Sequence, residues 1–132
     1  DYSKNLIKKI KCDSRIKYVG NLAQKQLLKK LQNYDLAVVP SIWMETGPLT
    51  ILEAFAAGIP VAGTNLGGIK ELLKEQAGCF LLPPDPLAWK NLFLSILNKK
   101  IILSKFKPPK IRTFFDVESD FEKLILKNYS NK

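Results

Sequence analysis

Apolar residues recur along the chain in short segments that are separated by glycine, proline and polar turns. Apolar positions three and four residues apart predict helices, and continuous apolar runs predict strands that are buried on both faces. Helices are expected at 2–11, 23–33, 48–57, 69–75, 87–97 and 116–129. Strands are expected at 15–20, 35–39, 59–64 and 79–82. Because helices and strands alternate with short connections, the pattern predicts the α/β class with a doubly wound parallel sheet.

Residues at the ends of these segments support the expected boundaries. Asn21 is a candidate cap for the helix over 23–33, and Pro48 suits the first turn of the helix that ends at Gly58. Residues 99–112 contain Pro108-Pro109 and predict an irregular linker to the terminal helix. The inward side of that helix is expected to carry the apolar residues Val117, Phe121, Leu124 and Ile125.

Length and composition favour one globular unit. The chain has 132 residues, of which 46% are hydrophobic and 25% are charged, and it contains no run of 18 apolar residues. A membrane-spanning helix is therefore not expected. The chain begins with aspartate and has no apolar signal core, so we interpret it as a piece of a longer protein. It has no histidine, which excludes an imidazole base or a His-based zinc site within these residues.

The net charge of +9 is concentrated at the two ends of the chain. Residues 1–30 carry +7, residues 31–93 carry −3, and residues 94–132 carry +5. Almost all of the basic residues are lysines, which are poorer than arginine at bidentate phosphate contacts. We interpret these ends as solvated lysine faces, keep a weak peripheral contact with anionic membrane lipid as the alternative, and expect no nucleic-acid partner.

The two cysteines, Cys12 and Cys79, lie far apart in the sequence and belong to no motif. They predict two free thiols in a reducing, cytoplasmic environment.

The stretch over 36–69 contains only two charged residues, Glu45 and Glu53. A segment this apolar is expected inside the fold, where a carboxylate is costly without a partner. Glu45 lies in the loop after an expected strand and Glu53 lies one turn into the next helix, so both can reach a ligand at the carboxyl edge of the sheet. Unpaired N–H groups over 48–51 would add hydrogen-bond donors there. Alternatively, Glu45 is an ordinary exposed loop residue and Glu53 bonds to backbone amides nearby.

Other functional motifs are missing from the sequence. It contains no G-x-G-x-x-G, no G-x-x-x-x-G-K-[ST] and no G-x-S-x-G. A cluster of metal-ligating residues is also missing. The pair Gly67-Gly68 after the expected strand over 59–64 permits a close approach of the backbone to a ligand, or else serves only as a turn.

The segment from Pro40 to Leu73 resembles the donor-binding domain of glycosyltransferase family 4, the retaining enzymes of the GT-B fold. The resemblance consists of Glu45 and Glu53 with seven residues between them, then Ala54, Gly58 and Pro60-Val61, then Gly67-Gly68 and Glu71. It implies that the chain, residues 1–132, is a partial C-terminal donor-binding domain with a Rossmann-like sheet, and that 99–132 is a linker with a terminal helix. The acceptor, a glycan or a lipid, would be held by a preceding domain.

The resemblance also implies a role for particular residues. Glu45 would be the catalytic-site carboxylate that contacts hydroxyls of the transferred sugar, and Glu53 would accept hydrogen bonds from the ribose. The sugar and phosphate end of a UDP- or GDP-sugar would be lined by Thr46, Gly47, Leu49 and Thr50. The base would lie near Val19, Gly20 and Asn21. Transfer would need no metal and no cofactor, and these residues alone would have little or no activity.

The sequence departs from the family pattern after the first glutamate. Many members have E-G-F-G there, whereas this chain has Glu45-Thr46-Gly47-Pro48, and Pro48 removes one N–H. The basic residues that clamp the pyrophosphate in the family would precede Asp1. Two other interpretations are kept: a non-catalytic nucleotide-binding or interaction module, and an unrelated flavodoxin-like α/β domain.

Overall fold

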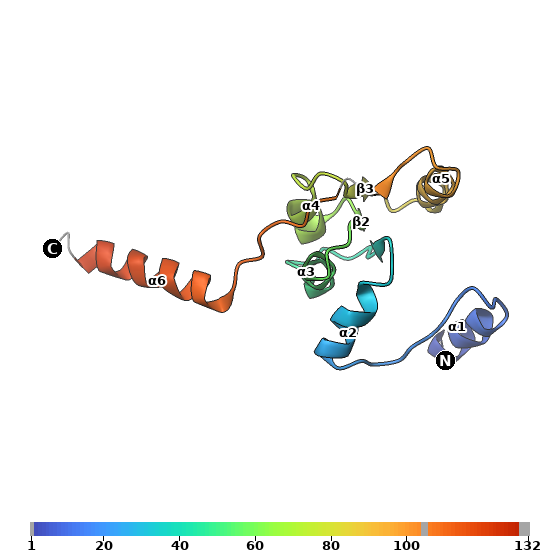
Figure 1. The fold of residues 1–132 in the computed structure, drawn as a ribbon, viewed down its shortest axis with the longest axis horizontal. Helices are drawn as coiled ribbons and strands as arrows, with labels where there is room; N and C mark the ends of the chain where they lie inside the picture. The colour runs from blue at the N-terminus through green and yellow to red at the C-terminus, as the bar shows by residue number, and fades with distance from the viewer. Residues whose placement is uncertain (1, 104–105, 130–132) are drawn as a thin grey trace.

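The computed structural model describes residues 2–103 and 106–129 (Figure 1). Helices and strands alternate through most of this part of the chain, as the apolar pattern predicts. The helices are α1 (Tyr2–Lys11), α2 (Gln24–Leu31), α3 (Leu49–Ala56), α4 (Gly67–Leu73), α5 (Pro86–Leu97) and α6 (Phe114–Tyr129). The strands are β1 (Ala37–Val39), β2 (Val61–Thr64) and β3 (Phe80–Leu82).

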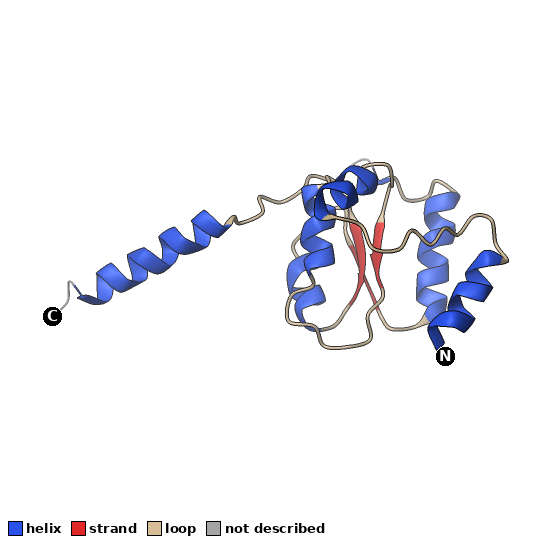
Figure 2. Ribbon diagram, turned by 90° about the horizontal axis from the view of Figure 1, so that it is seen from below, coloured by secondary structure: helices blue, strands red, loops and turns tan. Residues whose placement is uncertain are grey.

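The three strands form one parallel sheet in the order β1-β2-β3. Ala37 pairs with Val61 and Gly63 pairs with Leu81, so each strand lies beside the next one in the chain. Helices α3 and α4 cover one face of the sheet and α5 lies on the other (Figures 1 and 2). The α/β class and the doubly wound parallel arrangement are therefore confirmed.

The core lies between the sheet and the layer of α3 and α4. All four residues of β2 are buried, and the buried side chains that pack around it come from α3, α4 and the turn after α3. The largest of them are Ile51, Phe55, Ile59, Ile69 and Leu73. This placement fixes both ends of α3 relative to the carboxyl edge of the sheet.

Helix α3 has the boundaries that its terminal residues predict. Pro48 precedes its first residue with an extended backbone. At the other end Gly58 has φ +79°, its N–H donates to Phe55 O at 2.9 Å, and the Ile59 N–H donates to Ala54 O at 3.1 Å. This paired arrangement is the Schellman motif, which terminates the helix with a left-handed residue that glycine adopts without a steric penalty.

The strand expected over 15–20 is not formed. Its residues are exposed and follow an irregular path between α1 and α2 (Figure 1). A strand is stable only when a neighbour satisfies its backbone groups, and no strand among the described residues lies beside this segment. The expected cap at Asn21 is also wrong, because α2 follows Ala23 and has no side-chain cap.

Helix α6 projects away from the rest of the chain (Figures 1 and 2). Its apolar residues Val117, Phe121, Leu124 and Ile125 are 44% to 66% exposed, so the expectation that they point inward is wrong. The helix begins two residues earlier than predicted, at Phe114, because Thr113 and Asp116 bond reciprocally. The Asp116 carboxylate accepts the Thr113 N–H at 2.7 Å, and the Thr113 hydroxyl accepts the Asp116 N–H at 3.3 Å. These contacts form a capping box.

The described residues between α5 and α6 form neither an α-helix nor a strand, as predicted for the linker, and positions 104–105 of that linker lie outside the described residues. The second half of the linker packs against the core. The ring of Phe106 stacks on Phe55 of α3 with centroids 5.7 Å apart, and Ile111 packs against the core.

Candidate donor site

The loop between β1 and α3 lies directly against the start of α4. The Gly68 N–H donates to the carbonyl oxygen of Glu45 at 2.6 Å. A Cβ atom on Gly68 would lie 2.5 Å from the Thr46 carbonyl, and one on Gly67, which has φ +44°, would lie 2.8 Å from Glu45 O. The glycine pair therefore does more than form a turn, because it lets the loop that carries Glu45 approach the backbone of α4 closely.

Glu45 is half-buried within this loop. No hydrogen bond or ion pair joins its carboxylate to any residue that the structure describes. The three residues before it, Ile42, Trp43 and Met44, are 71% to 79% exposed. The expectation that the whole apolar stretch lies inside the fold is therefore wrong at this loop, whose large apolar side chains are exposed.

The backbone around the start of α3 offers hydrogen-bond donors. Among the described residues, the N–H groups of Thr46, Gly47, Leu49 and Thr50 have no hydrogen-bond acceptor. The Ile51 N–H does have one, since it donates to Pro48 O at 3.1 Å, so the expected set of free donors over 48–51 is smaller than predicted. Free donors at the positive end of a helix can bind an anion or a polar oxygen.

Glu53 lines a cavity of about 210 Å³ between α2 and α3. It is half-buried, and its carboxylate, like that of Glu45, has no partner among the described residues. The alternative in which Glu53 bonds to neighbouring backbone amides is therefore not observed in this part of the chain. The walls of the cavity are formed by Gln24, Leu28, Leu49, Leu52, Glu53, Ala56 and Ile111.

The predicted site residues are only partly brought together. Leu49 and Glu53 share the α2–α3 cavity, whereas Thr50 is not among its lining residues. Val19, Gly20 and Asn21 are exposed in the segment before α2 and do not line it either. Gln24, the first residue of α2 and three positions after Asn21, does line it. Gln24, Leu28 and Leu31 follow i, i+4 and i+7 spacing and so share one face of α2, but this spacing alone does not place that face beside Glu53.

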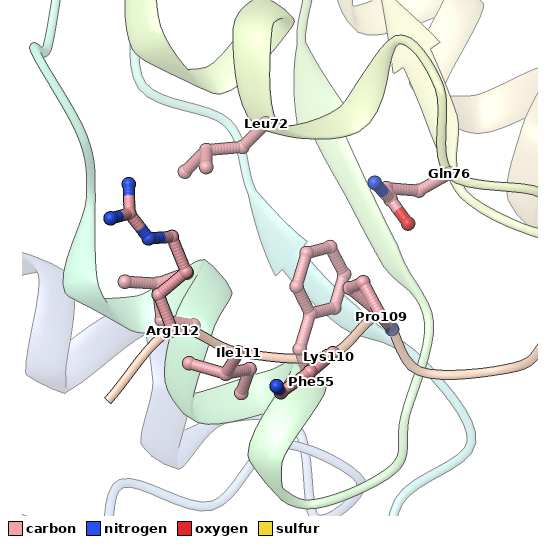
Figure 3. A pocket seen from close by; sticks show the side chains of 8 residues that line it. Phe55, Leu72, Gln76, Pro109, Lys110, Ile111 and Arg112 are labelled. Carbon is pink, nitrogen blue, oxygen red and sulfur yellow. The ribbon is translucent and has the colours of Figure 1, made fainter. Parts of the chain in front are cut away.

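A second cavity, of about 270 Å³, lies beneath the linker on the outer side of α3 and α4 (Figure 3). Leu72 approaches it from α4, Phe55 from α3, and Lys110 and Arg112 from the linker (Figure 3). The guanidinium of Arg112 already bonds to Asp120 at 2.5 Å. This cavity lacks both signature glutamates, and its arginine is engaged within the linker and α6, so the candidate site is the edge that holds Glu45 and Glu53.

The remaining chemistry of the described residues is modest. Cys12 and Cys79 are both free, as predicted, and burial raises the pKa of the Cys79 thiol, which accepts the Val61 N–H at 3.4 Å. Three or more His, Cys, Asp and Glu side chains do not come together as a metal site within the described ranges. In the same ranges, no helix has the length and apolarity needed to cross a membrane.

Comparison with known protein families identifies the family to which the chain belongs. The family model of glycosyl transferases group 1 matches residues 1–110. The chain belongs to this glycosyltransferase family. The resemblance to glycosyltransferase family 4, with its retaining GT-B enzymes, is thereby confirmed.

Individual relatives of this glycosyltransferase domain agree with that family. The domain is 32% identical over 92 residues to the uncharacterized glycosyltransferase MJ1607 of Methanocaldococcus jannaschii. The matched region covers 67% of this chain and 23% of the relative. The domain is also 40% identical over 83 residues to a glycogen synthase of Mycobacterium tuberculosis. That matched region covers 62% of this chain and 20% of the relative. The glycosyltransferase domain thus spans about a quarter or less of the length of these two proteins.

A solved structure matches the glycosyltransferase domain in three dimensions. Anabaena Alr3699/HepE in complex with UDP and glucose superposes with a TM-score of 0.64 at 27% identity, covering 76% of this chain and 28% of that one. The same protein in complex with UDP-glucose gives a TM-score of 0.61. The three-stranded parallel sheet therefore corresponds to part of a GT-B glycosyltransferase.

Proposed function

We propose that this chain is the donor-binding part of a retaining glycosyltransferase that uses a UDP- or GDP-sugar. The observation that carries the proposal is the pair Glu45 and Glu53. Two half-buried carboxylates without an internal partner flank free backbone donors at the start of α3. An ionised carboxylate only accepts hydrogen bonds, so sugar hydroxyls are suitable ligands for both.

Each part of the proposed site has a distinct task. Glu53 accepts hydrogen bonds from the ribose hydroxyls within the α2–α3 cavity, and Glu45 accepts them from the transferred sugar. The free N–H groups between Thr46 and Thr50 bind the diphosphate. As the bond between the sugar and the diphosphate breaks, negative charge grows on the leaving oxygen, and fixed N–H donors stabilise that charge more in the transition state than in the ground state.

The acceptor, a glycan or a lipid, is proposed to bind to another domain of the full-length protein. Basic residues of that longer chain would complete the diphosphate site. A membrane-bound acceptor would bring the lysine-rich segment over 1–30 close to anionic lipid.

Titration of the full-length protein with UDP-sugars and GDP-sugars tests this function. We expect saturable binding of one of the two nucleotide classes, and transfer to a glycan or lipid acceptor with retention, read from the anomeric signals of the product by NMR. Absence of binding to both classes would contradict donor binding. Binding without transfer to any acceptor tested would instead support a non-catalytic nucleotide-binding module.

A further inference from the structure

Thr64 carries a buried hydroxyl that the proposed function leaves without a task. It is the last residue of β2 and is 0% exposed. Among the residues that the structure describes, its hydroxyl is the one buried side-chain polar group without a hydrogen-bond partner. Such a group costs free energy, whereas valine has nearly the same shape and no polar atom to satisfy. Packing alone therefore does not explain a threonine at this position.

The Thr64 side chain lies at the carboxyl edge of the sheet, on the face away from the main core. A Cβ on Gly63 would lie 2.5 Å from Ile69 Cγ2, so Gly63 faces the layer of α3 and α4. Successive residues of a strand point to opposite faces, which places Thr64 on the face that α5 covers (Figures 1 and 2). Thr64 pairs with Leu82, the last residue of β3, and Gly63 pairs with Val39, the last residue of β1.

The hydrogen-bond ladder between β1 and β2 stops at the same point. The Ala37 N–H donates to Pro60 O at 2.9 Å, and alternate residues of a parallel strand repeat this contact. Four residues further along both strands, the same pattern would pair the Ser41 N–H with Thr64 O. That oxygen instead accepts the Leu66 N–H at 2.8 Å. The N–H of the half-buried Ser41 has no acceptor among the described residues, so it is a second unpaired group near the Thr64 hydroxyl.

We propose that Thr64 is a positioning residue of the donor site: its hydroxyl and the Ser41 N–H bind one ordered water, which fixes the start of the loop that carries Glu45. Buried waters bond to polar groups that lack other partners. The water accepts the Ser41 N–H, and the Thr64 hydroxyl bonds to it as donor or acceptor. The inference rests on the proposed function, because it assumes that Glu45 binds the transferred sugar.

Hydrogen bonds along the loop connect its start to Glu45. The Ser41 hydroxyl accepts the Trp43 N–H at 3.3 Å, and the Trp43 carbonyl oxygen accepts the Glu45 N–H at 3.0 Å. The Glu45 carbonyl oxygen in turn accepts the Gly68 N–H. Contact with α4 therefore restrains the loop at Glu45, and the water on Thr64 restrains it at Ser41. Loss of the second restraint would let Glu45 shift relative to the bound sugar.

A crystal structure of the full-length protein tests the water directly. We expect a water within about 3.2 Å of both Thr64 Oγ1 and Ser41 N, and we expect it to be missing from a Thr64→Val variant. This test needs no donor and no acceptor. A wild-type structure without a water between these two atoms would overturn the proposal.

Kinetics of the full-length protein test the positioning role. UDP-glucose and GDP-mannose are the probes, and release of the nucleoside diphosphate measures turnover. Thr64→Val should lower kcat about tenfold, the effect of one hydrogen bond, while the dissociation constants for UDP and GDP stay within about twofold. Thr64→Ser restores the hydroxyl and should recover most of kcat.

Ala62→Gly is the matched control for a purely structural effect. Ala62 is 0% exposed and lies two residues before Thr64, on the same face of β2, and the change removes a methyl group without touching a polar side chain. Glycine weakens a strand, so chemical denaturation should show a lower free energy of unfolding for Ala62→Gly, with kcat kept.

The outcomes separate the two proposals. An unchanged kcat in Thr64→Val would overturn the positioning role, and so would losses of stability and kcat that match those of Ala62→Gly. In both cases donor binding stands if the wild type binds UDP or GDP. A wild type that binds neither nucleotide would overturn the proposed function and the positioning role together, whereas the water site is still decided by the crystal structure.

Discussion

The Gly68 N–H donates to the carbonyl oxygen of Glu45 at 2.6 Å, which joins the start of α4 to the loop that carries the first signature carboxylate. The two residues are 23 positions apart in the sequence, yet their backbones meet where the strands end. The contact is possible because Gly68 has no side chain: a Cβ there would lie 2.5 Å from the Thr46 carbonyl carbon and oxygen.

Gly68→Ala should therefore displace the Glu45 loop. We expect the free energy of unfolding to fall by about 1–3 kcal/mol, the usual cost of inserting an atom into a packed contact, and sugar transfer to fall as well. Chemical denaturation measures the first effect. Gly47→Ala is the matched control for stability, since a Cβ at Gly47 meets no atom within 4 Å. Equal stability of the two variants would contradict the close contact at Gly68.

Removal of each of the two carboxylates should have a different effect on binding and on transfer. Glu53→Ala is expected to weaken UDP binding by about 10- to 100-fold, since hydrogen bonds to a charged group contribute about 1.5–3 kcal/mol. Glu45→Ala should leave UDP binding nearly unchanged and chiefly lower transfer. Calorimetry with UDP and a transfer assay distinguish the effects. Glu71→Ala, which removes an exposed carboxylate of α4, serves as the control. Equal losses of UDP affinity in both variants would refute the separate roles.

The stacking of Phe106 on Phe55 should stabilise the fold. Phe106→Ala removes a half-buried ring that lies 5.7 Å from the buried Phe55 ring, so we expect the free energy of unfolding to fall by about 2–3 kcal/mol. Phe115→Ala is the control, because the Phe115 ring is 77% exposed on α6 and its loss should cost under about 0.5 kcal/mol. Equal unfolding midpoints for the two variants would show that the linker does not pack as described.

The start of α6 should depend on pH through Asp116. The backbone N–H and then the hydroxyl of Thr113 hold the pKa of the Asp116 carboxyl below its ordinary value. Because the folded-state pKa is lowered, the ionised carboxylate stabilises the helix start above the ordinary pKa, and this contribution is lost as the pH falls through the lowered pKa. Thr113→Ala should raise the pKa of Asp116, as followed by NMR of the carboxyl carbon, whereas Thr113→Ser should keep it low. A Thr113→Ala variant with an unchanged pKa would contradict the capping box.

Local signals were sufficient to predict several elements of the fold. Pro48 and Gly58 bound α3, and the apolar spacing over 87–97 predicted α5, which runs from Pro86 to Leu97. The strands β1, β2 and β3 were predicted from their continuous apolar sequence, although of the three only β2 is fully buried. In each case the information lies within the element or within a few residues of it.

Features that depend on distant neighbours were not predicted correctly. The segment over 15–20 has the composition of a strand but lacks one beside it among the described residues. The apolar side of α6 has the spacing of a packed helix but is exposed in the part of the chain that the structure describes. The position of Gln24 beside Glu53 depends on how α2 packs on α3, which no motif encodes. Sequence reasoning therefore identified the two carboxylates, while the cavity around Glu53 emerged only from tertiary packing.

The linker between α5 and α6 is anchored at two points, Phe106 on Phe55 and Ile111 in the wall of the α2–α3 cavity. The four residues between these anchors, 107–110, therefore form a spacer of fixed length. An insertion within it would shift one anchor from its contact, whereas an insertion between Ile111 and Thr113 would only lengthen the arm that carries α6. Among related sequences, variation in length should accordingly be suppressed between the anchors and tolerated after them.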